Sequence, residues 1–436
     1  MRVLLVGSGA REHALVWKLS QERDVTEVLC APGNAGIARI ARVVNVSAAE
    51  PDALLALARR ERIDLTVVGP ELPLDRGIVD LFMSHGLRIF GPSRAAAQLE
   101  CSKVFAKAFM AKHGIPTARY RVCEDAATAH ALIAHGEFGF PVVVKADGLA
   151  AGKGVIVAPD RASADAAIRG VMEDREFGQA GDRIVIEECL VGPELSFFAV
   201  CDGTRAVPLL AAQDHKRVFD GDKGPNTGGM GAFAPTPLME DVLATQVMRD
   251  IVEPVVQGLK AEGQQYRGFL YAGLMLTCDG PKVIEFNVRF GDPEAQVVLP
   301  AIDGDLAPHL VAAAEGSSLS SPLRFRPEKH VGVVMASEGY PASGPLGRSI
   351  TGLDGAAALD DVFVFHAGTK LAGSGNDSPI VTAGGRVLTV VGRGASFELA
   401  IARAYEGVSR IAFEGMHYRR DIGQKALRQA ATTREN

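Results

Sequence analysis

The sequence predicts an α/β protein that opens with a doubly wound parallel sheet, and two observations carry this prediction. Over the first 100 residues, short apolar or β-branched runs alternate with helical stretches, which is the pattern of repeated strand-helix-strand units. Glycine turns follow the strands, where open sheets of this kind place their ligand-binding loops. The expected strands are 3–6, 26–30, 64–69 and 87–90, the helices 11–23 and 51–61, and the turns 33–36, 69–70 and 91–93.

The rest of the chain is expected to divide into further parts. Ser102 is the expected N-cap of a helix to about residue 112, which leads into a small α/β segment at about 117–192. Strand patterns dominate the next part, and the pattern restarts after the serine-rich stretch 317–322. The expected domains are 1–101 with the doubly wound sheet, 102–192 with the small segment, 193–325 with a central mixed sheet, 326–424 as a separate C-terminal α/β module, and 425–436 as a solvated tail.

Composition argues against several classes of function. The 436 residues carry a formal net charge of −6, so there is no global basic field to recruit nucleic acid or an anionic membrane. The six cysteines stand singly without a C-x-x-C pair, which argues against a zinc site or a disulfide framework and indicates a reducing cytoplasm. The apolar run at 3–6 is far shorter than the about 20 residues of a membrane span. We therefore expect a cytoplasmic protein.

The turn after the first strand superficially matches a dinucleotide-binding fingerprint. Gly7 and Gly9 are in place, but Glu12 stands where the third glycine would allow close helix packing, which argues against a nicotinamide site. Two interpretations remain: a tight strand-to-helix turn, or an anion site formed by helix N-terminal amides with Arg11 nearby.

A lysine at a strand end precedes a glycine-rich loop in KADGLAAGKGV at 145–155. Glycines let backbone amides approach phosphate oxygens, and Lys145 supplies a point charge. The run lacks the Walker pattern, and a surface hairpin with exposed lysines is the alternative.

In IVIEECLVGPE at 184–194, Glu187 and Glu188 end a strand and offer acceptors to an adenine amino group, while Glu194 suits ribose hydroxyls. Ordinary solvated acids are the alternative.

The run VIEFNVRFGDPE at 283–294 predicts a metal site. Side chains alternate along a strand, so Glu285, Asn287 and Arg289 share one face. A carboxylate and an amide oxygen two residues apart suit Mg²⁺ that also holds phosphates. Arg289 would stabilise charge on a transferred phosphoryl group or bind an anionic substrate. A half-exposed strand is the alternative, but it leaves the following RFGDPE unexplained.

The polar, glycine-rich stretch 214–231 shows neither helical nor strand periodicity, and a loop of that length in a compact domain usually carries function. Flexible glycines, a basic pair and Asp214 suit a phosphorylated sugar and an ammonium group. A solvated loop is the alternative.

Together, the Lys145 loop, the EECL edge and the EFN strand resemble the ATP-grasp fold in their order and spacing. Several longer runs closely resemble the glycinamide ribonucleotide synthetase family, and the likeness extends from residue 1 to about 423. These runs are GxGxREHA at 7–14, APGNAG at 31–36, VGPE at 68–71, KADGLAAGKGV at 145–155, QDHKR at 213–217, GPNTGGMGA at 224–232, EFNVRFGDPE at 285–294, FHAGTK at 365–370 and GGRVL at 384–388.

The resemblance implies an α+β ATP-grasp architecture in which the small segment at about 117–192 is a mobile lid. It implies ligation of glycine to 5-phosphoribosylamine, giving glycinamide ribonucleotide, ADP and phosphate through a glycyl phosphate, as in the second step of de novo purine synthesis. ATP is then a substrate, and Mg²⁺ or Mn²⁺ is the expected metal cofactor. The protein is expected to be a cytoplasmic monomer without nucleic-acid or membrane partners.

Matching motifs also imply site residues. Arg289, Lys145 and Asp214 are the expected catalytic residues. Glu285 and Asn287 are the expected metal ligands. The expected ATP-binding residues are Lys103, Lys145, Gly148, Gly152, Lys153, Gly154, Glu187, Glu188, Leu190 and Glu194. The expected residues around glycine or phosphoribosylamine are Gly9, Glu12, Asp214, Lys216, Asn226, Thr227, Gly228, Gly229, Met230, Arg289, Gly291 and Asp292.

The sequence departs from the pattern at two places. Many ATP-grasp enzymes carry an acidic metal ligand on the preceding strand, but Leu274, Met275 and Leu276 are apolar, so the metal shell is expected to rely on nucleotide oxygens and water. Val288 replaces the cysteine of some relatives, beneath the site. There are three rival functions. The first is ligation of another carboxylate or amine, and the DHKR and NTGGM motifs argue against it. The second is a nicotinamide dehydrogenase, against which Glu12 argues, and the third is a non-catalytic ATP-binding or scaffolding protein.

Overall fold

The computed structural model describes residues 1–436 apart from 150–153, 320, 374, 376–377 and 436. The N-terminal sheet is parallel as predicted, in the order β3-β2-β1-β4-β5. Both faces of β1 are buried: Val3 and Leu5 pack in one apolar cluster with helix α1, while Leu4 and Val6 pack in another with α2 and α4. The elements are β1 Arg2–Gly7, α1 Ala10–Ser20, β2 Glu27–Pro32, β3 Arg42–Val43, α2 Pro51–Arg60, β4 Leu65–Val68, α3 Glu71–Asp75, α4 Ile78–Ser84, β5 Ile89–Phe90 and α5 Arg94–Cys101.

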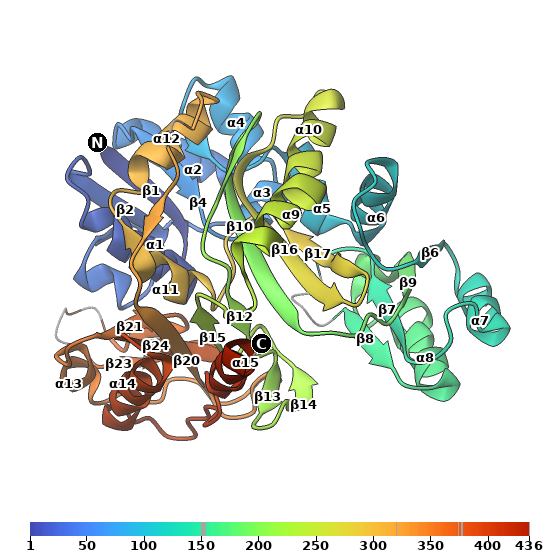
Figure 1. The fold of residues 1–436 in the computed structure, drawn as a ribbon. Coiled ribbons are helices and arrows are strands. Elements are labelled where there is room, and N and C mark those ends of the chain that lie inside the picture. The colour runs from blue at the N-terminus through green and yellow to red at the C-terminus, as the bar shows by residue number, and fades with distance from the viewer. Residues whose placement is uncertain (150–153, 320, 374, 376–377, 436) are drawn as a thin grey trace.

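Helix α6 (Lys103–Lys112) begins at the predicted N-cap, where the Ser102 hydroxyl accepts a hydrogen bond from Phe105 N at 3.0 Å. Residues 117–192, which we call the lid segment, form an antiparallel sheet in the order β6-β9-β7-β8 with its own apolar core. Figure 1 shows this segment projecting away from the rest of the molecule. Its elements are β6 Tyr120–Cys123, α7 Ala126–His135, β7 Val142–Ala146, β8 Val155–Ala158, α8 Arg161–Ile168 and β9 Ile184–Glu188.

The central sheet is antiparallel, in the order β11-β10-β16-β17. On β17, Glu285 pairs with Gly273 of β16, and Asn287 pairs with Tyr271. The strands are β10 Glu194–Asp202, β11 Ala206–Pro208, β16 Arg267–Thr277 and β17 Gly280–Asn287, and the nearby helices are α9 Asp241–Val247, α10 Glu253–Ala261, α11 Ala295–Val298 and α12 Ala307–Glu315.

The C-terminal sheet differs from the separate module that the sequence predicted, because two strands from before residue 326 pair into it. Its order is β12-β15-β20-β24-β21. Its strands are β12 Gln213–Asp214, β15 Gly231–Ala234, β20 Lys329–Ala336, β21 Val362–His366 and β24 Arg386–Gly394, covered by α13 Leu353–Ala357 and α14 Phe397–Arg410. This sheet therefore connects the predicted polar stretch directly to the C-terminal part of the chain.

Two further expectations need correction. The stretch 214–231 is not an irregular loop, because β13 (Arg217–Phe219) and β14 (Lys223–Asn226) form a hairpin within it. Residues 425–435 of the expected solvated tail belong to helix α15 (Gln424–Glu435), in which Ala426 is fully buried. The hairpin is tied to this C-terminal segment by two ion pairs of Asp222, with Arg419 at 2.8 Å and with Lys425 of α15 at 2.9 Å. Figure 1 shows α15 beside β13 and β14.

Among the described residues, no helix combines the length and the apolar character needed to cross a bilayer. All six cysteines are free thiols.

Candidate active site

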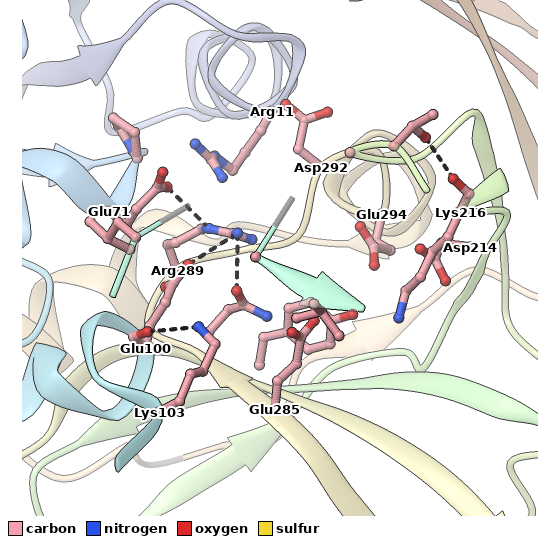
Figure 2. A pocket seen from close by; sticks show the side chains of 18 of the residues that line it. Arg11, Glu71, Glu100, Lys103, Asp214, Lys216, Glu285, Arg289, Asp292 and Glu294 are labelled. Carbon is pink, nitrogen blue, oxygen red and sulfur yellow. Dashed lines mark hydrogen bonds and ion pairs between the residues drawn. The ribbon is translucent and has the colours of Figure 1, made fainter. Parts of the chain in front are cut away.

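Two cavities lie where the four sheets meet. The central cavity has a volume of about 360 Å³, and the lid-side cavity, which extends along β7 and β9, has a volume of about 550 Å³. Both are lined by Val155, Asp214, Lys216, Thr227 and Glu285, so they adjoin. The charged residues around the central cavity, most of them labelled in Figure 2, are Glu71, Glu100, Asp214, Glu285, Asp292 and Glu294 with Arg11, Lys103, Lys216, Arg289 and Arg386. This near balance of charge suits a ligand that carries both signs.

Arg289 lies at the middle of the central cavity, just after β17 (Figure 2). Its Nη2 is 3.2 Å from Glu100 Oε1 and donates to Asn287 Oδ1 at 3.1 Å, and its Nε is 3.4 Å from Glu71 Oε2. Burial alone would lower the pKa of Arg289, but Glu100 and Glu71 outweigh it and raise the pKa. The guanidinium is therefore a fixed cation, as binding of an anionic group requires.

Glu285 and Asn287 present their oxygens on the same face of β17, as predicted. Burial favours the neutral form of Glu285, but Lys216, Lys103, Lys145 and Arg289 together lower the pKa of its carboxyl. In the described part of the chain, no group of three or more His, Cys, Asp or Glu side chains is arranged to hold a metal ion. A carboxylate and an amide oxygen beside a phosphate-binding cavity nevertheless fit Mg²⁺, which typically uses one or two carboxylates and completes its octahedron with phosphates and water.

Asp214, at the end of β12, and Lys216, two residues further along the chain, line both cavities. Lys216 Nζ donates to Glu194 Oε2 at 2.7 Å, so the predicted ribose-binding carboxylate already has a cationic partner. Desolvation raises the pKa of Asp214 to about 7; Glu294 and Glu194 add to the rise and Lys216 opposes it. Glu294 is fixed by the Ser196 hydroxyl, which donates to its Oε1 at 3.0 Å. These carboxylates form an acidic wall that is suited to an ammonium group.

The lid-side cavity is lined by Lys145, Glu187, Glu188, Leu190 and Glu194, all of which the sequence placed near ATP. Lys145 is buried, and its Nζ donates to Ile284 O at 2.9 Å and lies 3.0 Å from Glu187 Oε1. That oxygen is buried and has Lys145 as its ion-pair partner, but no described residue donates to it with hydrogen-bond geometry, so it retains capacity for a ligand donor. Glu188 differs, because Arg119 donates to both of its carboxylate oxygens, from N at 3.0 Å and from Nε at 2.7 Å.

The glycine loop meets helix α6 through Asp147. Its Oδ1 accepts hydrogen bonds from Ser102 Oγ at 2.8 Å and Val104 N at 3.1 Å, and its Oδ2 accepts from Arg183 at 2.6 Å. This arrangement holds the start of α6, and with it Lys103, beside Gly148 and Gly154; all three line the central cavity. The predicted Gly152 and Lys153 lie outside the described residues.

The start of α1 is closed by its own side chain. Glu12 Oε2 accepts a hydrogen bond from Gly9 N at 2.5 Å, and Glu12 Oε1 pairs with Arg11 Nε at 2.6 Å. The carboxylate thus occupies the position at which a dinucleotide-binding turn would receive a phosphate, so Glu12 supports the tight-turn interpretation. Neither Gly9 nor Glu12 is among the residues that line the central cavity, although Arg11 is.

The glycine-rich strip at 226–230 is held against the cavity from the C-terminal sheet. Arg386 of β24 donates from Nη1 to Gly228 O and to Asp292 O, both at 2.6 Å, and its Nη2 lies 3.4 Å from Asp292 Oδ2. Although burial favours the neutral acid, Arg386 and Arg11 lower the pKa of Asp292.

Within this strip and the nearby loop, Asn226, Thr227 and Gly228 line cavities, but three other predicted residues do not. Met230 is fully buried in an apolar cluster with Val218 and Ala336. Gly229 packs against Pro293, where a Cβ would lie 2.4 Å from Pro293 Cδ, and Gly291 packs against Glu294, where a Cβ would lie 2.5 Å from Oε2. These glycines permit close packing beside the site.

Sequence reasoning missed five charged residues of this region: Glu71, Glu100, Lys107, Glu294 and Arg386. Three of them, Glu71, Glu294 and Arg386, lie inside the motifs VGPE, EFNVRFGDPE and GGRVL, but the sequence suggested no role for them. Lys107 follows Lys103 by four residues on α6, a spacing that places both on one helix face. Glu100 carried no local signal, because its role depends on Arg289, 189 positions along the chain.

Comparison with known proteins gives matches over nearly the whole chain. Three family models match in succession: the N domain of phosphoribosylglycinamide synthetase over 1–100, its ATP-grasp (A) domain over 101–295, and its C domain over 330–425. A phosphoribosylamine–glycine ligase of Xylella fastidiosa is 51% identical over 100% of both chains, and one of Caulobacter vibrioides is 50% identical over 98% of this chain and 99% of its own.

Solved structures agree with this likeness. The crystal structure of phosphoribosylamine–glycine ligase from Thermotoga maritima matches with a TM-score of 0.80 and 35% identity, covering 97% of this chain and 100% of that chain. A biotin carboxylase of Campylobacter jejuni matches with a TM-score of 0.74 at 16% identity, covering 96% of this chain and 92% of its own, a likeness of fold alone.

Proposed function

The chain belongs to the phosphoribosylglycinamide synthetase family, and on this premise we propose that its two adjoining cavities join glycine to 5-phosphoribosylamine through a glycyl phosphate. The protein is an ATP-dependent carbon–nitrogen ligase of purine biosynthesis, with glycinamide ribonucleotide, ADP and phosphate as products. One observation supports the assignment of ATP to one cavity and of glycine to the other. The lid-side cavity, with Lys145 and Glu187, meets the mixed-charge central cavity at Glu285, Asp214 and Lys216.

ATP is proposed to lie in the lid-side cavity with its triphosphate directed toward this boundary. Glu187 Oε1, to which no described residue donates with hydrogen-bond geometry, supports an adenine amino contact there. Lys145 and Lys103 supply positive charge toward the phosphates, and Gly148 and Gly154 allow the lid backbone to approach them. Glu194 is proposed to exchange its contact with Lys216 for the ribose hydroxyls when the nucleotide binds.

The divalent metal is proposed to bind Glu285 and Asn287. It is Mg²⁺, and Mn²⁺ can take its place. When bound, such an ion neutralises charge on the phosphates during transfer. The oxygen donor set supports this proposal, as does the ionised state that the surrounding cations favour for Glu285.

Glycine is proposed to bind in the central cavity, its carboxylate toward Arg289 and its ammonium group toward Asp214. The glycine carboxylate oxygen attacks the γ-phosphorus of ATP, the bond to the β-phosphate oxygen breaks, and ADP leaves. The unprotonated amine of phosphoribosylamine then attacks the glycyl carbonyl carbon, the C–O bond to phosphate breaks, and the amine gives up a proton. The enzyme contributes positioning and charge neutralisation, without a covalent enzyme intermediate.

We propose that the protein works as a cytoplasmic monomer. Six free thiols support a reducing compartment. Sedimentation equilibrium at working concentrations tests the monomer, and a stable dimer would overturn it.

The test of function is release of ADP from purified protein with MgATP, glycine and freshly generated phosphoribosylamine, omitting each component in turn. We expect ADP and glycinamide ribonucleotide only in the complete mixture. If intact phosphoribosylamine is present and neither product forms, the assignment fails, and other carboxylates and amines should be screened.

A further inference from the structure

A buried polar cluster behind the lid-side cavity joins four elements that surround it. We define this polar cluster as Lys107 on α6, Thr117 before β6, Lys145 on β7 and Glu187 on β9. Lys107 Nζ lies 3.0 Å from Glu187 Oε2 and donates to Thr117 Oγ1 at 2.7 Å. Thr117 Oγ1 in turn donates to Val283 O at 2.7 Å, two residues before Glu285 on β17. Lys107 is 2% exposed and is not among the described residues that line either cavity.

Glu187 lies between two lysines and uses a different oxygen for each. Its Oε2 faces Lys107 and its Oε1 faces Lys145, each at 3.0 Å. A lysine ammonium has three donors, and Lys145 directs one to Ile284 O at 2.9 Å, so a share of its hydrogen-bonding capacity remains for a phosphate. The position of Lys145 Nζ therefore depends on how strongly Glu187 attracts it.

Lys107 moderates that attraction. A buried carboxylate needs a counter-charge, because desolvation strongly penalises an unpaired ion. With Lys107 present, the second carboxylate oxygen of Glu187 has a counter-charge of its own. Without the charge on Lys107, Glu187 would be compensated by Lys145 alone and would hold its ammonium group away from the nucleotide.

We propose that Lys107 is a positioning residue for nucleotide binding, which acts through Glu187 to hold Lys145 and the adenine-side carboxylate oxygen in place. The inference rests on the proposed role of the lid-side cavity as the ATP site. Lys107 is expected to affect the binding of ATP and not the binding of glycine. The reason is that the polar cluster lies beside the lid-side cavity and not beside the central cavity.

Three variants test the proposal. Lys107→Gln removes the charge but keeps a hydrogen-bond donor, and Lys107→Arg keeps the charge. The matched control is Lys112→Gln on the same helix, where the exposed Lys112 pairs with Glu262 at 2.7 Å. The readouts are the dissociation constant of a non-hydrolysable ATP analogue with Mg²⁺ by calorimetry, the KM values for ATP and glycine, and thermal melting.

We expect Lys107→Gln to weaken analogue binding about 10- to 100-fold, by analogy with the loss caused by removing a residue that orients a metal ligand. Its KM for glycine should match that of the wild type. Lys107→Arg should recover most of the affinity, and Lys112→Gln should bind like the wild type. Analogue binding by folded Lys107→Gln within twofold of the wild type would overturn the proposal, as would equal rises in KM for ATP and glycine.

A pH series keeps the test open if Lys107→Gln does not fold. Burial lowers the pKa of Lys107 to about 8, with Glu187 opposing that fall and Lys145 adding to it. The other groups facing Lys107 are Glu188 and the Tyr120 ring, whose centroid is 5.6 Å from Nζ. Analogue affinity of the wild type should fall as pH rises through about 8, while Lys107→Arg, which stays charged, should not follow. A flat wild-type profile, or the same fall in Lys107→Arg, would overturn the inference.

Failure of this inference is distinct from failure of the proposed function. A wild-type protein that forms no product with all three substrates refutes the function. An active wild type whose Lys107→Gln variant folds and binds the analogue normally refutes only the role of Lys107.

Discussion

Replacing Arg386 by methionine tests whether the C-terminal sheet helps to form the site. Methionine keeps much of the side-chain volume and removes the guanidinium, which joins the glycine-rich strip to the loop after β17. The change removes two hydrogen bonds of 2.6 Å, to Gly228 O and Asp292 O, and the ion pair with Asp292 Oδ2 at 3.4 Å.

Hydrogen bonds made by a charged group contribute about 1.5–3 kcal/mol each. The lower value is appropriate because the Arg386 side chain is 23% exposed, which gives about 3 kcal/mol for the pair. One factor of ten in rate corresponds to about 1.4 kcal/mol, so kcat/KM for glycine or phosphoribosylamine should fall by about 100-fold if the whole loss appears in transition-state binding.

The assay is steady-state ADP release with each co-substrate varied, together with thermal melting. The matched control is Arg393→Met on the same strand, which breaks hydrogen bonds of 2.8 and 2.5 Å to Asp361, and neither residue lines either cavity. Arg393→Met should leave kcat/KM unchanged. If folded Arg386→Met keeps kcat/KM for both co-substrates within twofold of the wild type, the C-terminal sheet does not position the site in the way argued.

Three further predictions follow from the same geometry. Glu285→Ala should lose nearly all turnover while melting like the wild type, because metal and phosphate binding lose their carboxylate; turnover close to the wild type would refute the metal assignment. Burial raises the pKa of Asp214 to about 7 from its ordinary 3.8, so the stability that its protonated form contributes is lost as pH rises from about 4 to about 7, whereas glycine binding should strengthen as the carboxyl ionises. KM for glycine should therefore fall between about pH 6 and about pH 8, and Asp214→Asn should flatten the profile; an unaltered profile in the variant would exclude Asp214 as its source. Asp147→Ala removes the acceptor of the hydrogen bonds from Ser102 and Val104 at the start of α6. The KM for ATP should therefore rise several-fold while the KM for glycine stays unchanged. Equal KM values for ATP in the variant and the wild type would show that Asp147 does not position Lys103.

Local sequence was sufficient for the parts of the fold whose pattern is local. The N-terminal strands were predictable because β1, β2 and β4 are short apolar runs buried on both faces, and Ser102 was recognisable as a cap from its position alone. The shared face of Glu285 and Asn287 followed from strand alternation.

Other parts of the fold required tertiary structure. The hairpin β13–β14 is polar and half-exposed, and it pairs where Arg419 meets Asp222, 197 positions away in the chain, so no periodicity in its own residues indicates it. Helix α15 likewise depends on packing against the C-terminal core, where Ala426 is buried.

The same division holds in the site. The sequence by itself determined the class of chemistry, because each motif that indicates it lies within one continuous strand or loop. These motifs contain Lys145, Glu187, Glu285, Asn287 and Arg289. Only the tertiary structure decided which charges face one another: Glu71 and Glu100 on Arg289, Arg386 on Asp292, and Lys107 on Glu187. The physical reason is that a charge pair is specified by distance in space, and each of these pairs joins residues that lie at least 80 positions apart in the chain.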